Sequence, residues 1–110
     1  MSVTAIPLLE SKAAELAQTT QITSVGMVTI IDKFTAYNSD PAAQTLTVNM
    51  IPPAGAAGAA NISIVKTLQA GETYTFPEIV GHIVGKGGSV GTAASKNAVI
   101  NIRASGRVIS

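Results

Sequence analysis

Residues 28–50 read VTIIDKFTAYNSDPAAQTLTVNM, and the pattern of this stretch decides the fold. In its second half Leu46 and Val48 alternate with polar residues, which is the two-residue period of a half-buried β-strand. In its first half Phe34 and Ala36 share one face in the same way. The cluster NSDP between the two runs is typical of a turn. The stretch therefore predicts two strands joined as a hairpin.

An isolated hairpin is marginal in water, so its apolar face needs a second sheet to cover it. The rest of the chain supplies short apolar–polar runs at spacings of about 8–12 residues, punctuated by Gly and Pro. We therefore predict an all-β protein, an antiparallel β-sandwich of seven or eight short strands. Besides the hairpin, the expected elements are strands at residues 19–23, 61–67, 73–76, 89–93 and 98–104, turns at 71 and 105–107, a helical turn or kinked crossing segment at 77–84, and a surface loop at 52–60.

The first 24 residues differ from the sandwich expected at residues 25–110. Pro7 stands where the first turn of a helix tolerates it, and Leu9 and Leu16 would share one face of that helix. A helix of this length is marginal on its own. Two interpretations therefore stay open for the segment before the edge strand at 19–23. It is either a short helix packed on its own sandwich or a partly extended arm that lies on a neighbouring subunit.

The composition predicts a protein whose surface is covered by other chains. Hydrophobic residues make up 46% of the chain and charged residues only 12%, against about 25% charged residues in a typical soluble domain. Much of the apolar content is Ala, and there are only two Phe, two Tyr and no Trp, so we expect a thin core. A free monomer usually keeps a charged surface for solubility, and this chain does not.

The charge balance and the remaining composition exclude several classes of function. A net charge of +1 provides no electrostatic footprint for nucleic acid. Without Cys the chain can form neither a disulfide nor a thiolate metal site. The first residues lack the features of a signal peptide, and no apolar run approaches the roughly 20 residues of a membrane helix. We expect no membrane partner and a chain that is made in the cytoplasm.

No arrangement of side chains in the sequence predicts catalysis. His82 is the only histidine, and Glu78 alone beside it makes neither a metal site nor a catalytic triad. Residues 81–86, GHIVGK, have the wrong spacing for a phosphate-binding loop and are better explained as a turn. We therefore expect no catalytic, cofactor-binding or metal-binding residues.

Two further groups of residues have a structural and a functional interpretation. Asp32 and Lys33 are neighbours on opposite faces of one expected strand, so we expect one of them to point inward or to an interface. Tyr37, Tyr74 and Phe76 could form a platform on which a sugar stacks, but with so few aromatic residues core packing is the favoured role.

Five segments of the chain resemble a family of small structural proteins of tailed bacteriophages. Within that family the sequence is most similar to the capsid decoration proteins, also called staple or cement proteins, of epsilon-fifteen-type short-tailed phages. The segments that carry the resemblance are AIPLLESK (5–12), IDKFTAYN (31–38), LQAGETY (68–74), PEIVG (77–81) and IRASGR (102–107).

The resemblance implies a jelly-roll-like β-sandwich without enzymatic activity, on the capsid surface of a virion. It implies two partners, the major capsid protein and further copies of this chain in a dimer or higher oligomer. A neck, tail or fibre protein, or a carbohydrate-binding module of a fibre, is the alternative. The residues expected at the interface are Ile6, Leu8, Leu9, Leu16 and Tyr37.

Overall fold

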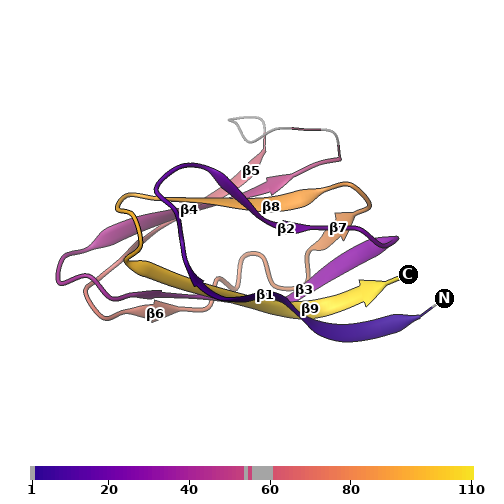
Figure 1. Ribbon diagram of the computed structural model, residues 1–110, viewed down its shortest axis with the longest axis horizontal. Helices are drawn as coiled ribbons and strands as arrows, with labels where there is room; N and C mark the ends of the chain where they lie inside the picture. The colour runs from indigo at the N-terminus through magenta and orange to yellow at the C-terminus, as the bar shows by residue number, and fades with distance from the viewer. Residues whose placement is uncertain (1, 54, 56–60) are drawn as a thin grey trace.

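The protein is all-β and consists of two antiparallel sheets that face each other (Figure 1). The computed structural model describes residues 2–53, 55 and 61–110, and these residues contain no helix. Most of the expected loop at 52–60 lies outside the described residues. The strands are β1 (Val3–Ala13), β2 (Thr19–Thr23), β3 (Val28–Asn38), β4 (Gln44–Ile51), β5 (Ile62–Leu68), β6 (Thr73–Tyr74), β7 (Ile83–Gly85), β8 (Ser89–Ala94) and β9 (Ile100–Ile109).

Strands of the first half of the chain pair with strands of the second half in reverse order. One sheet has the order β1-β9-β3-β6, with β7 also paired to β3, and the other has the order β2-β8-β4-β5. The first strand thus pairs with the last and the second with the last but one, while β3 pairs with β6 and β7, and β4 with β5. Successive pairs lie in alternate sheets. The two termini meet at one end of the molecule, because β1 pairs antiparallel with β9 (Figure 1).

The expected hairpin of residues 28–50 is wrong, although both of its strands are present. β3 belongs to the sheet of β9 and β4 to the sheet of β8, so the turn between them carries the chain across the sandwich. Phe34 and Leu46 are both fully buried and meet the common core from opposite sheets. Alternation fixes which face of a strand is buried, but it does not say which strand lies beside it. The hairpin and the crossing turn therefore have the same sequence pattern.

Of the two interpretations of the N-terminal segment, the helix is wrong, because the segment forms the strand β1. β1 pairs with β9 from Val3 to Ala13, and backbone hydrogen bonds between Ser2 and Ser110 extend the pairing to the termini. A short isolated helix is marginal, whereas the edge of β9 offers a row of backbone partners. The expected edge strand at residues 19–23 is confirmed as β2.

A β-bulge in β3 leaves both Asp32 and Lys33 exposed to solvent. The pairing of β3 with β9 shifts between Ile31 and Lys33, and both of these charged residues are exposed between the buried Ile31 and Phe34. The extra residue of a bulge lets two neighbours face solvent where a regular strand would turn one of them inward. Of the two alternatives expected for this pair, the inward one is therefore wrong, and a position at an interface stays a prediction.

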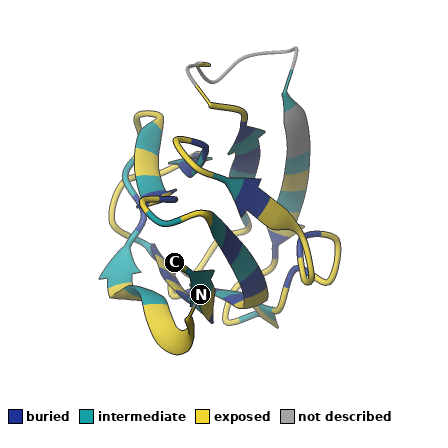
Figure 2. Cartoon of the chain, turned by 90° about the vertical axis from the view of Figure 1, so that its right-hand side faces the viewer, coloured by how far each residue is buried: buried dark blue, intermediate teal, exposed yellow. Residues whose placement is uncertain are grey.

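The core is thin and is centred on three aromatic rings. Phe34 and Phe76 contact edge to face with ring centroids 5.4 Å apart, and Tyr74 packs on Phe76 at 4.8 Å. Figure 2 shows the buried and exposed residues alternating along the strands around this layer. After Phe76 the chain turns and enters the short strand β7. Residues 77–82 contain no helix and join two strands that both pair with β3, so this segment does not cross between the sheets. Tyr74 and Phe76 take the packing role expected of them, but for Tyr37 that expectation is wrong, because its side chain is exposed.

The turn expected at residues 105–107 is wrong, since β9 continues through it to Ile109. Gly106 pairs with Ile31 on one side and with Ile6 on the other. A Cβ atom at Gly106 would collide with the carbonyl oxygen of Ile30 and lie 2.8 Å from Cδ1 of Leu8. Glycine at position 106 therefore allows the neighbouring strands to approach closely, which is one common reason for glycine within a strand.

Replacing Gly106 with Ala should destabilise the sandwich, because the methyl group has to push β3 or Leu8 away. We expect a loss of about 1–3 kcal/mol in the free energy of unfolding, as for other overpacked sites. Urea denaturation checks the value. Gly85→Ala is the matched control, since nothing lies within 4 Å of a Cβ atom there, and its change should stay within about 0.5 kcal/mol. Equal effects of the two variants would contradict the close approach at Gly106.

Candidate functional site

The outer face of the β1-β9-β3 sheet carries a hollow with polar walls. Cross-strand pairing places Lys33 opposite Ser105, Thr35 opposite Arg103 and Tyr37 opposite Asn101, all on the outward side of β3 and β9. The hollow has a volume of about 330 Å³. Its polar lining consists of Ser11, Lys33, Thr35, Tyr37, Asn101, Arg103 and Ser105, which we call the polar hollow.

A second surface feature is apolar and lies at the end of the molecule that carries both termini. Met27 donates its backbone N–H to the carbonyl of Ile109 at 2.8 Å, and Val3 is the strand partner of the same residue. Val25 is 81% exposed and Ile83 63% exposed. We call the exposed residues at this end the terminal apolar patch: Val3, Ile6, Val25, Met27 and Ile83.

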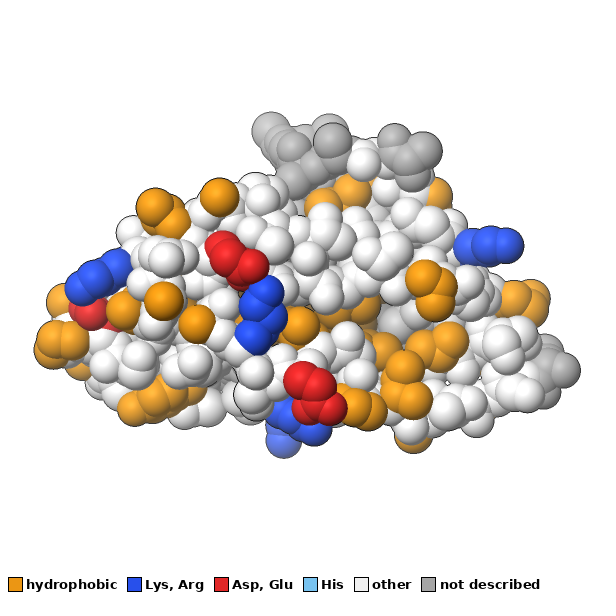
Figure 3. All heavy atoms as spheres, in the orientation of Figure 1, with side chains coloured by type: hydrophobic (Ala, Val, Ile, Leu, Met, Phe, Trp, Pro, Cys, Tyr) orange, Lys and Arg blue, Asp and Glu red, His pale blue; other side chains and the backbone are white. Residues whose placement is uncertain are grey.

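Figure 3 shows the side of the sandwich on which β1 and β2 form the sheet edges. Hydrophobic side chains reach the surface there, several of them toward the end with the termini. Single exposed apolar residues are ordinary, but a group of them marks a contact surface. The outward edge of β1 adjoins this group, and it has no strand partner among the residues that the structure describes. An edge strand of this kind offers backbone hydrogen bonds to another chain.

The structure separates the five residues expected at an interface. Leu8 and Leu9 are partly buried and pack against the core of their own chain. Ile6 is exposed in the terminal apolar patch, whereas Leu16 is exposed at the far end of β1, where its N–H bonds to Asn97. Tyr37 is 42% exposed in the wall of the polar hollow. Ile6, Leu16 and Tyr37 are therefore available to a partner but lie on different parts of the surface.

The sequence interpretation missed two strongly exposed apolar residues, Val25 and Met27. They flank Gly26 in the connection from β2 to β3, where no alternation marks a face. Large apolar residues beside a glycine in a connection were the available signal, because such a position does not belong to a core face. Ile83 was missed because the three-residue strand β7 is too short to show a period.

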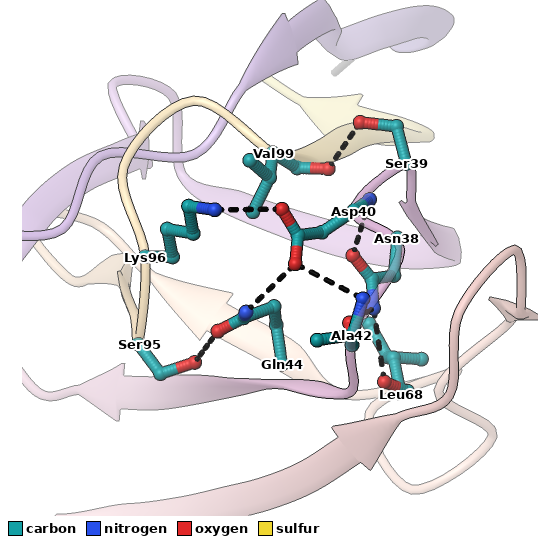
Figure 4. A network of polar contacts seen from close by, with 9 residues as sticks. All are labelled: Asn38, Ser39, Asp40, Ala42, Gln44, Leu68, Ser95, Lys96 and Val99. Carbon is teal, nitrogen blue, oxygen red and sulfur yellow. Dashed lines mark hydrogen bonds and ion pairs between the residues drawn. The ribbon is translucent and has the colours of Figure 1, made fainter.

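The opposite end of the sandwich is closed by a polar network around Asp40, drawn in Figure 4. The carboxylate of Asp40 accepts hydrogen bonds from Lys96 Nζ at 2.8 Å, from Gln44 Nε2 at 3.0 Å and from the backbone N–H of Ala42 at 3.1 Å. Its side chain is only 6% exposed. The hydrogen bond from Lys96, followed by that from Gln44, holds the pKa of Asp40 below its ordinary value of 3.8.

Asn38 continues this network into a third connection. Its side-chain amide donates to the carbonyls of Ala42, Leu68 and Gln69, while its Oδ1 accepts from the N–H of Asp40. The network therefore ties the β3–β4 turn to the β5–β6 and β8–β9 connections (Figure 4). Among the residues that the structure describes, no buried side-chain nitrogen or oxygen lacks a partner. A fully satisfied network of this kind stabilises one arrangement of the loops.

His82 lies apart from these groups. It is exposed and lines a hollow of about 400 Å³ together with Met50, Pro52, Ile83 and other residues. Within residues 2–53, 55 and 61–110, no three His, Asp or Glu side chains are grouped in a way that could hold a metal ion. None of the described segments is a helix with the length and apolar character that crossing a membrane takes.

Comparison with protein-family models, with curated proteins and with solved structures gives no match for this chain.

The Asp40 network makes stability depend on pH. Because its pKa is lowered in the folded protein, the unfolded chain binds the proton more readily. The stabilisation is therefore fully present above pH 3.8 and is lost as the pH falls through the lower folded value. We expect Asp40→Asn to lower the Tm at pH 7 and to flatten the fall of Tm between about pH 5 and pH 2.

Thermal unfolding followed by circular dichroism checks this pH profile. Glu10→Gln is the control, because Glu10 is exposed and its ion-pair partner Arg103 lies 3.9 Å away. This variant should keep the profile of the wild type. If the profile of Asp40→Asn runs parallel to that of the wild type, the carboxylate does not stabilise the end of the sandwich.

Proposed function

We propose that this chain is a non-enzymatic structural protein of a bacteriophage virion. In this proposal it is a decoration protein that binds the outside of the capsid, contacts the major capsid protein and stabilises the shell. The single observation that carries the proposal is the terminal apolar patch beside the free edge of β1. Binding of another chain over the exposed Val25 and Met27 is favourable, because it removes apolar area from water at a surface with few charges.

The strand order supports the jelly-roll-like topology that the resemblance implies. In a jelly roll a long antiparallel ribbon folds over so that successive strand pairs alternate between two sheets. The pairs β1–β9, β2–β8, β3 with β6 and β7, and β4–β5 follow this rule, with the first and third in one sheet and the second and fourth in the other.

β1 is paired within its own sheet, so the proposed contact of the N-terminal segment with a neighbouring subunit runs through the edge of this strand and not through an arm laid on that subunit. The outward edge of β1 is available for a strand of a neighbouring subunit, and Ile6 at 37% exposure and Val3 at 60% exposure add apolar area. Strand addition provides main-chain hydrogen bonds, and the side chains beside it provide selectivity. Contacts of this size are weak singly, but many copies on a symmetric shell add through avidity.

Particle composition tests the proposal. In purified particles of a phage that encodes this chain, quantitative mass spectrometry should find it in a copy number comparable to that of the major capsid protein. A copy number of about a dozen or fewer, as in rings of low cyclic symmetry, would place it in the neck, tail or fibre instead. Absence from the particles would contradict a virion role.

Variants of the terminal apolar patch test which surface binds the shell. The double variant Val25→Ser with Met27→Ser should keep its Tm, because both side chains are exposed, but bind particles that lack the protein about tenfold more weakly or worse. Val65→Ser is the matched control, since Val65 is 65% exposed on β5 in the other sheet. If both variants bind like the wild type, another surface contacts the shell.

A further inference from the structure

The polar hollow lies on the outer face of the sheet that contains β1, β9 and β3. Its walls come from three strands, β1, β3 and β9, so regular backbone pairing holds the side chains in place. The register shifts of β1 between Pro7 and Lys12 bring Ser11 to one side of it. Its volume of about 330 Å³ falls at the lower end of the range of small-ligand sites.

The charge of the hollow is positive and largely unneutralised. The ammonium group of Lys33 forms no hydrogen bond or ion pair with any residue that the structure describes. Arg103 comes only within 3.9 Å of Glu10, which is longer than a hydrogen bond, and both residues are largely exposed. The neighbouring carboxylate, Asp32, is already held by two hydrogen bonds from Arg107 at 2.9 and 3.0 Å. No carboxylate lines the hollow itself.

The remaining polar residues of the lining suit a ligand with many hydroxyl groups, and Ile102 and Ala104 complete the lining. Ser11, Thr35, Asn101 and Ser105 offer hydroxyl and amide groups that both donate and accept hydrogen bonds. Tyr37 adds an exposed aromatic ring, which offers apolar area to the C–H face of a sugar and a hydroxyl group to its rim. The other two aromatic residues considered for such a platform, Tyr74 and Phe76, are packed on the inner side of the sheet.

We propose that the polar hollow binds an acidic saccharide, with Lys33 and Arg103 on its carboxylate and Tyr37 against a sugar ring. The site is separate from the terminal apolar patch, so this proposal goes beyond a structural role on a shell and does not depend on it. An acidic peptide would share the charge, but the aromatic wall and the neutral donors and acceptors favour a sugar. The open shape of the hollow implies millimolar affinity, since shallow sites leave much of the ligand in water.

The test uses the full chain and four probes, with binding followed by NMR chemical-shift changes of the backbone amides. Trigalacturonate is the acidic saccharide, maltotriose the neutral one, sulfate the simple anion and tetraglutamate the acidic peptide. We expect trigalacturonate to shift amides of residues 33–37 and 101–105 with saturation in the millimolar range, and the other probes to bind at least about fivefold more weakly.

Lys33→Gln should weaken trigalacturonate binding at least about fivefold, because a charge-assisted hydrogen bond is lost. Lys86→Gln is the matched control, a lysine on the exposed turn after β7, and it should leave the affinity unchanged. Tyr37→Leu removes the aromatic ring and should also weaken binding, and the spectra themselves report whether each variant is folded. No shifts with trigalacturonate, equal binding of maltotriose or sulfate, tighter binding of tetraglutamate, or equal effects of Lys33→Gln and Lys86→Gln would each overturn the proposal.

Discussion

The position of β9 between β1 and β3 is the constraint on which the rest of the structure depends. The strand spans Ile100–Ile109 and is paired along most of its length on both sides. Its inward residues Ile100, Ile102 and Ala104 are at most 1% exposed, so β9 also provides part of one side of the core. Because β1 lies at the start of the chain and β9 at its end, this sheet is complete only when the whole chain has folded.

The two ends of the sandwich are stabilised in different ways. At one end the Asp40 network joins three connections by hydrogen bonds and closes the molecule with polar groups. At the other end the termini meet, and Val25 and Met27 lie open to solvent. A protein with few charged residues can keep one closed end and one apolar end if the apolar end is covered on assembly. This asymmetry links the composition of the chain to the proposed role.

The sequence predicted where strands lie better than how they pair. Alternation in β4 and the turn at Gly71, which has a φ of +73°, were sufficient to place those elements. The same alternation could not distinguish a hairpin from a turn that crosses between sheets, because both bury the same faces. Of the two interpretations of the segment before residue 19, the helix failed because the segment pairs with the edge of β9, and tertiary pairing overrides weak local preference.

The candidate sites were harder to predict, since they depend on which strands become neighbours. Tyr37 was identified as a contact residue and Lys33 shares its face of β3, but Arg103 and Asn101 join them only through the pairing of β3 with β9. Gly106 was interpreted as a turn residue because the sequence does not show how closely the strand pairs approach. The bulge at Asp32 and Lys33 could not be predicted from the sequence either, since a bulge is a property of two paired strands.

The most direct test of this account is native-state hydrogen exchange of the free protein, followed residue by residue by NMR. The central claim is that β1 is a full strand of the sandwich and holds its outer edge in place for a neighbour. The account predicts that amides of β1 bonded to β9 are protected to a degree comparable with the amides that join β9 to β3. Exchange of the β1 amides at the rate of an unfolded peptide, with β9 and β3 still protected, would contradict it.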